Sequence, residues 1–148
     1  MPHHRDHLPL VYSCSGCSSA AQLANHLAVK LDRAGLAEMS CIAGVGGGVP
    51  SLVRKAQEAQ AAGRPIMALD GCALACVKAC LESREVRASV HVQLQRLGVK
   101  KVYHEGFVPD QAGALFDRLA AQALAMARGP EGEEAKGCGG RGSCACAS

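Results

Sequence analysis

The sequence is poor in aromatic residues: tryptophan is absent, and the 148 residues include only two tyrosines and two phenylalanines. Large rings therefore cannot fill the interior, and alanine, valine and leucine have to form the core. Small aliphatic side chains of this kind suit helices packed closely against a sheet. With 49% apolar residues, the chain is long enough and apolar enough for one domain with a real core.

An excess of charge is also missing, since the formal net charge is only +3. No dense run of lysine and arginine with interleaved aromatics is present, so we expect no nucleic-acid partner. No apolar stretch is long enough to span a bilayer, so we expect no membrane partner. The apolar residues 8–12 form too short a core for a signal peptide, and we therefore expect a cytoplasmic protein.

Cysteine, by contrast, is abundant, with nine residues. In a reducing compartment, clustered cysteines indicate metal or redox chemistry more often than a disulfide framework. An odd number also fits poorly with a fully paired scaffold. The cysteines are therefore the first candidates for function.

Apolar runs alternate with helical patterns along the chain. Together they predict a single three-layer αβα domain over residues 8–128 with a mainly parallel sheet, of Rossmann or flavodoxin type. Residues 1–7 and 129–148 are expected to be disordered, the latter a glycine-rich tail with Cys138, Cys144 and Cys146. The expected strands are residues 8–12, 36–42, 65–69, 88–94 and, more weakly, 99–104. The expected helices are residues 18–34, 50–61, 73–84 and 109–128, and residues 43–49 are expected to be a flexible turn.

Five cysteines follow directly after predicted strands. Cys14 and Cys17 follow the first strand, Cys41 lies at the end of the second, and Cys72 and Cys76 follow the third. In parallel α/β sheets, ligands bind outside the carboxyl ends of the strands. We therefore expect these five cysteines to converge on one edge of the sheet.

Four of these five cysteines form two pairs, and together the pairs have the chemistry of a metal site. The pair Cys14 and Cys17, in a C-x-x-C turn, can bring two sulfurs to one ion, and Cys72 and Cys76 can complete a tetrahedral set. The helices that follow both pairs are expected to lower the thiol pKa values and so favour thiolate ligands. The sequence predicts bound zinc, or another soft metal ion, as cofactor.

The remaining candidates near this edge are less specific. Cys41 and Cys80 are either additional ligands or reactive thiols, or else small apolar residues of the core. Asp70 and Gly71 form the turn before Cys72, and we expect Asp70 to accept hydrogen bonds from backbone amides rather than to bind the metal.

A glycine-rich stretch, GVGGG at residues 44–48, precedes a predicted helix. Its glycines Gly44, Gly46, Gly47 and Gly48 could cradle an anion, as loops before helices do. No Gly-Lys-Ser/Thr follows, however, so the phosphate-binding pattern of nucleotide hydrolases is absent. A flexible turn is the simpler interpretation.

Four pieces of the chain resemble the DGC-domain family, which takes its name from a central Asp-Gly-Cys. They are YSCSGCS at residues 12–18, CIAGVGG at residues 41–47, DGCALAC at residues 70–76 and QRLGV at residues 95–99. The likeness covers roughly residues 8–108. It implies zinc binding through chelating cysteines, and it implies no known reaction.

Three functions from different classes remain open. The first is a non-catalytic metal-binding protein for sensing, storage or transfer, whose partner is the metal ion, and we favour it over an enzyme. The second is a thiol redox enzyme of thioredoxin-like type that uses Cys14 and Cys17. The third is an iron–sulfur protein, because cysteine thiolates also hold such clusters. The sequence indicates no particular protein partner.

Overall fold

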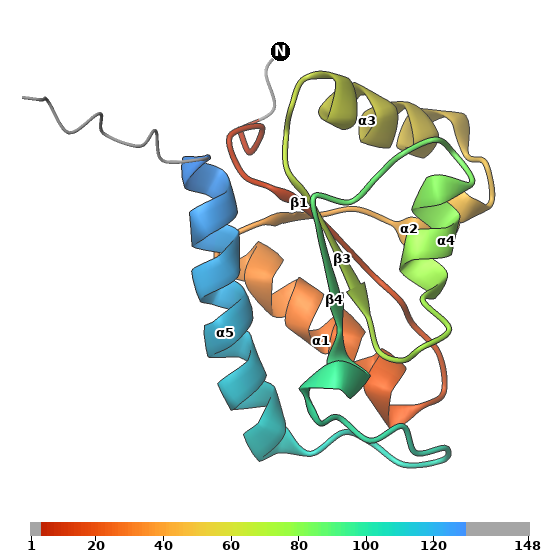
Figure 1. The fold of residues 1–148 in the computed structure, drawn as a ribbon, viewed down its shortest axis with the longest axis vertical. Helices are drawn as coiled ribbons and strands as arrows, with labels where there is room; N and C mark the ends of the chain where they lie inside the picture. Colours follow the sequence, from red (N-terminus) through yellow and green to blue (C-terminus); the bar gives the residue numbers. More distant parts are fainter. Residues whose placement is uncertain (1–3, 130–148) are drawn as a thin grey trace, which may run out of the picture.

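The computed structural model describes residues 4–129 (Figure 1). Residues 1–3 and 130–148, which include Cys138, Cys144 and Cys146, lie outside the described residues. Residues 4–129 contain a four-stranded parallel sheet with the strand order β2-β1-β3-β4. The strands are β1 (Leu10–Ser13), β2 (Glu38–Met39), β3 (Ile66–Asp70) and β4 (Val90–Gln93).

Helices cover both faces of this sheet and make three layers (Figure 1). One face packs against α1 (Ser19–Arg33) and α5 (Pro109–Arg128). The other face packs against α2 (Ile42–Gly46), α3 (Pro50–Ala61) and α4 (Cys76–Glu82), and a short 3-10 helix, η1 (Leu94–Leu97), follows β4. The predicted α/β class with a parallel sheet is confirmed.

Alternating side chains of the strands build two separate apolar cores. Val11 and Met67 point toward α1 and α5, whereas Tyr12 and Ile66 point toward the other helices. This follows from the two-residue period of a strand that is buried on both faces. Because the strand side chains are medium-sized and the helices contribute mainly alanine and leucine, the layers pack without many aromatic rings.

The strand order places a topological switch point between β1 and β3. From β1 the chain moves to β2 on one side, and then crosses back to β3 on the other side. β1 and β3 pair in parallel, with Ser13 opposite Leu69. The loops that follow these two strands therefore leave the same edge in opposite directions, which is where open α/β sheets form binding crevices.

The second predicted strand is much shorter than expected, and the predicted flexible turn after it is wrong. β2 contains only Glu38 and Met39, and Cys41 lies beyond it as the N-cap of α2. The glycine-containing segment that follows is this short helix. Its formation depends on contacts from distant parts of the chain, which the local pattern does not reveal.

Those contacts come from α4 and the residues just after it. A Cβ added to Gly46 would lie 2.7 Å from Cys80 Sγ, so the glycine permits close packing of α2 against α4. The Arg84 guanidinium donates hydrogen bonds to the carbonyl oxygens of Val45 (3.1 Å) and Gly46 (3.0 Å). The Gly46 carbonyl is one of those that the end of a helix leaves without an intrahelical partner, whereas the Val45 carbonyl also accepts a hydrogen bond from Gly48 N (3.1 Å).

The weak fifth strand predicted at residues 99–104 is also wrong. Residues 99–108 form an irregular segment whose backbone bonds to Ser19, at the start of α1. Ser19 N donates to Val102 O (2.8 Å), Val102 N donates to Ser19 Oγ (3.0 Å), and Ser19 Oγ donates to Lys100 O (3.1 Å). Backbone groups that a fifth strand would offer to the sheet are thus used elsewhere.

The described part of the N-terminal segment differs from the expected disorder, since residues 4–7 form a turn. Arg5 Nη1 lies 2.9 Å from Asp32 Oδ1, and Arg64 Nη2 donates to the carbonyl oxygen of Arg5 at 3.0 Å. These bonds tie the turn to α1 and to the segment before β3.

Glu38 connects β2 to the rest of the domain and provides a test of stability. Its carboxylate contacts Lys55 Nζ and Arg64 Nη2, and only 16% of its side chain is exposed. Burial by itself would raise the pKa of Glu38, but hydrogen bonds and charge from Lys55 and Arg64 outweigh burial and lower it. Because the pKa is lower in the folded state, the ionised carboxylate stabilises the fold above its unfolded pKa, and this contribution is lost as the pH falls through the folded pKa.

We therefore expect Glu38→Gln to reduce the free energy of unfolding by about 1–2 kcal/mol at pH 7. Urea unfolding at pH 7 and pH 3 measures this difference, which should shrink at the lower pH. Glu58→Gln, an exposed substitution on α3, is the matched control and should change little. An equal loss at both pH values would contradict the proposed role of the charge.

Candidate metal centre

The β1 and β3 loops bring three of the four predicted ligand cysteines to one corner of the sheet. Cys14 follows β1, Cys72 follows β3, and Cys76 is the first residue of α4. The three are close enough for the charges of Cys72 and Cys76 to act on the Cys14 thiol. Cys17 lies three residues further along the β1–α1 loop and is exposed.

The Cys14 thiol is half-buried and accepts a hydrogen bond from Gly71 N at 3.2 Å. Burial raises the pKa of Cys14; the Gly71 bond opposes this rise, and the negative charges of nearby Asp70, Cys72 and Cys76 add to it. The expected lowering of the thiol pKa is therefore wrong for Cys14. The helix terminus is too far away to offset burial, since α1 begins only at Ser19.

Cys72 is half-buried and lies beside a cation. Lys101 Nζ approaches Cys72 Sγ to 3.5 Å. The turn that carries Cys72 is fixed by Gln95, whose backbone N donates to Gly71 O (3.1 Å) and whose Oε1 accepts from Ala73 N (3.1 Å). Gln95 follows β4, so the end of a third strand also contributes to this corner.

Asp70 stabilises the start of α4. It is 1% exposed, and its Oδ1 accepts a hydrogen bond from Val77 N (2.8 Å) while Oδ2 accepts one from Lys78 N (3.3 Å). Oδ2 also lies 2.9 Å from His91 Nε2, on β4. Asp70 thus accepts hydrogen bonds from backbone amides, as expected, but these amides lie seven and eight residues further along the chain rather than in the adjacent turn. Through these bonds and the His91 contact, Asp70 connects β3 with α4 and β4.

Gly71 allows the β3–α4 loop to approach α1 directly. A Cβ at this position would lie 2.6 Å from the carbonyl carbon and oxygen of Ala20, so any other residue would collide with the helix backbone. This contact holds the turn that carries Cys72 against the first residues of α1. The Asp-Gly-Cys sequence therefore combines three features: a buried carboxylate that accepts hydrogen bonds from the start of α4, a glycine that packs against the backbone of α1, and a thiol.

The two additional candidate thiols differ in their surroundings. Cys41 is exposed and lies with Ser13 and Asn25 around a cavity of about 340 Å³. Cys80 is half-buried against Gly46, and burial raises its pKa, with the negative charges of Cys76 and Asp70 acting in the same direction. The Cys80 side chain thus packs against α2 and helps to hold α4 on it. A role in ligation stays a prediction for both residues.

The glycines of the segment 44–48 lie within and just after α2. Gly46 serves packing, as described above, and a Cβ on Gly44 would collide with the side chain of Leu52 on α3. Gly47 is the C-cap of α2, and Gly48 has a positive φ of 79°. Anion binding by these glycines stays a prediction.

The thiols do not form a closed coordination sphere in this arrangement. Within residues 4–129, no three histidine, cysteine or acidic side chains lie close enough together to hold a metal ion. The donor chemistry nevertheless fits a soft ion, because thiolates are preferred ligands of zinc. Cys14 Sγ accepts a hydrogen bond from Gly71 N, and Cys72 Sγ accepts one from Lys101 Nζ. Metal binding by these cysteines would therefore require the loops to move and the sulfurs to exchange these partners.

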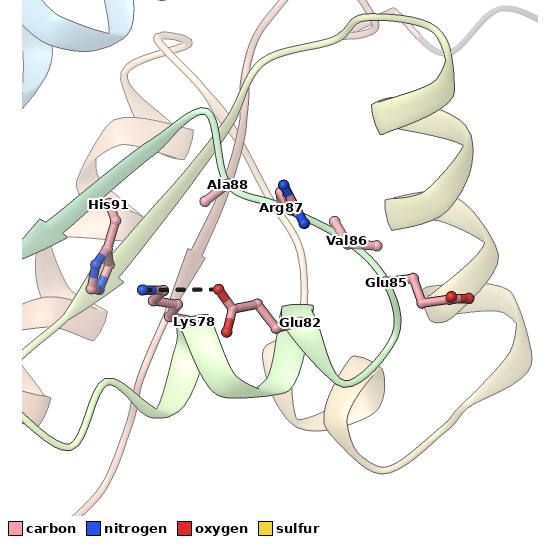
Figure 2. A pocket seen from close by; sticks show the side chains of 7 residues that line it. All are labelled: Lys78, Glu82, Glu85, Val86, Arg87, Ala88 and His91. Atoms are coloured by element: carbon pink, nitrogen blue, oxygen red, sulfur yellow. Dashed lines mark ion pairs between the residues drawn. The ribbon is translucent and has the colours of Figure 1, made fainter.

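A second open depression, of about 700 Å³, lies between α4, β4 and the segment that joins them (Figure 2). Lys78 and Glu82 of α4 face His91 across it, and charges of both signs line it. His91 connects this depression to the buried Asp70. The residues that line it are Lys78, Glu82, Glu85, Val86, Arg87, Ala88 and His91.

Sequence reasoning missed three residues that shape this region: His91, Gln95 and Lys101. His91 lies on β4, which pairs with β3, the strand that ends at Asp70. The rule that placed the cysteines at the strand ends would also have indicated Gln95. Lys101 lies in the segment mistaken for a strand, and nothing in the local pattern indicates its contact with Cys72.

No helix in the described part of the chain has the length and apolar character needed to cross a membrane.

Comparison with known proteins gives a specific match. The DGC-domain family model matches residues 10–119. A protein described as the anaerobic and virulence modulator AnvM, from Pseudomonas aeruginosa, is 60% identical over 114 residues, which cover 77% of this chain and 84% of the relative. No solved structure matches the chain. The family match spans all six described cysteines.

Proposed function

The chain belongs to the DGC-domain family, and from this premise we propose that it is a cytoplasmic regulatory protein that binds zinc or another soft metal ion. The proposed ligands are Cys14, Cys17, Cys72 and Cys76. The observation that carries the proposal is that the β1 and β3 loops, with three of these cysteines, meet at the switch point of the sheet.

Two further observations support a regulatory role over catalysis. The relative from Pseudomonas aeruginosa is described as a modulator. The C-x-x-C thiol that follows β1 has a raised pKa, because burial disfavours the charged form. A thiol with a raised pKa is a poorer nucleophile at neutral pH, which argues against Cys14 as the attacking thiol of thioredoxin-like chemistry.

The bound metal would supply a soft Lewis acid that holds the two loops together. Asp70 would keep α4 in place, so that Cys76 remains at the start of that helix. Gly71 would keep the Cys72 turn against α1. In this function, the chain positions thiols for binding and release rather than for a chemical reaction.

Metal analysis of the full chain, purified reduced and without oxygen, tests the proposal. We expect one soft metal ion per chain in a colourless protein. A brown protein with bound iron and sulfide would instead indicate an iron–sulfur protein. A metal-free protein that forms a reversible disulfide between Cys14 and Cys17 would indicate the redox function.

A further inference from the structure

The ammonium group of Lys101 lies between a predicted metal ligand and an aromatic ring. Its Nζ is 3.5 Å from Cys72 Sγ and 5.2 Å from the centroid of the Tyr103 ring. The ammonium group of a lysine side chain is charged at neutral pH. A full positive charge therefore lies next to a sulfur that the proposed function assigns to a cation.

Lys101 belongs to an irregular segment that begins at Val99, which is buried in the core, and becomes exposed further along. Residues 99–104 are held to α1 by the Ser19 hydrogen bonds and to the Cys72 turn by Lys101. Val102 is 37% exposed, Tyr103 55% and Val108 59%. With Phe107, Val102 and Val108 line a cavity of about 410 Å³ beside the start of α1. A change at Cys72 can thus reach an exposed apolar surface through a single side chain.

We propose that Lys101 is a positioning residue that competes with the metal ion for Cys72, so that metal binding displaces Lys101 and loosens residues 99–104. This inference rests on the proposed metal-binding function. A zinc–sulfur bond of about 2.3 Å brings a divalent charge to the place that the ammonium now occupies. Two cations that close to one sulfur repel each other, and the more weakly held lysine leaves.

The competition has two consequences. Metal affinity is lower than the four thiols alone would give, because the contact between Lys101 and Cys72 has to break first. The occupancy of the metal site is also transmitted to the segment that carries Val102 and Tyr103. A partner that binds this apolar segment would then distinguish the metal-bound protein from the metal-free protein.

Three variants of the full chain separate charge from structure. Lys101→Met removes the charge and keeps the length of the side chain. Lys101→Arg keeps the charge and should behave like the wild type. Lys100→Met, at the adjacent exposed lysine, is the matched control for loss of a positive charge near the site.

Two measurements on reduced protein test the proposal. Cobalt(II) titration, followed by the absorption of cobalt–thiolate bonds, gives the affinity, and we expect Lys101→Met to bind about fivefold more tightly than wild type and Lys100→Met. Hydrogen exchange of the backbone amides of residues 99–104 is expected to be faster in metal-free Lys101→Met than in metal-free wild type. Zinc should accelerate this exchange in wild type and in Lys101→Arg, and leave it unchanged in Lys101→Met.

The outcomes distinguish this inference from the function on which it rests. If wild type shows no cobalt–thiolate absorption, the proposed metal-binding function is wrong, and the competition is wrong with it. If wild type binds cobalt, but Lys101→Met binds no more tightly than Lys100→Met, only the competition is overturned. It is also overturned if zinc binds to wild type without changing the exchange of residues 99–104.

Discussion

Replacing Cys72 with serine is expected to weaken zinc binding by about a hundredfold or more. Serine has nearly the same size, but its hydroxyl is a hard ligand that stays protonated at neutral pH, so one of the four proposed zinc–sulfur bonds is lost. Because Cys72 is half-buried in a turn that Gly71 and Gln95 hold, the substitution should leave the fold intact. Competition against a chromophoric chelator, with reduced protein, measures the change.

Cys138→Ser is the control for the loss of a thiol, because Cys138 is outside the four proposed ligands, and it should keep the wild-type affinity. If Cys72→Ser binds zinc as tightly as Cys138→Ser, the assignment of Cys72 as a ligand is wrong. Cys41→Ser gives additional information, since a reduced affinity or stoichiometry would show that Cys41 contributes to the site. An unchanged stoichiometry would limit the site to the four proposed ligands.

Replacing Asp70 with alanine is expected to lower the free energy of unfolding by about 3 kcal/mol or more. The substitution leaves the backbone N–H groups of Val77 and Lys78 without their acceptor, and it removes the partner of His91. Asp70 is almost fully buried, so water cannot take over these bonds without opening the packing between β3 and α4. Urea unfolding of the metal-free protein at pH 7 measures the loss.

Two variants show whether the loss comes from these hydrogen bonds. Asp70→Asn keeps one acceptor oxygen and the same shape, and it should lose less stability than Asp70→Ala. Asp117→Ala, at an exposed position in α5, should change the stability by less than about 0.5 kcal/mol. If Asp70→Ala is no less stable than Asp117→Ala, then Asp70 does not hold α4 in place.

The sequence by itself determined the alternating order of strands and helices and the extents of α1, α3 and α5. Ser18 caps α1 through a local hydrogen bond from Ala21 N (3.3 Å), and Pro50 and Pro109 begin the other two helices. These signals act within a few residues, so a local pattern contains all the information that they need. The same alternation indicated a parallel sheet, and with it the positions of Cys14 and Cys72 directly after strands of that sheet.

Only the tertiary structure decided the features that depend on partners far away in the sequence. The short helix α2 exists because Gly46 packs on Cys80 and Arg84 bonds to its last carbonyl groups. The segment after η1 is irregular because its backbone bonds to Ser19, more than 80 residues earlier. The contacts of Asp70 with His91 and of Cys72 with Lys101 likewise join separate strands and loops. Such contacts follow from how whole layers pack, and short-range periodicity carries no information about that packing.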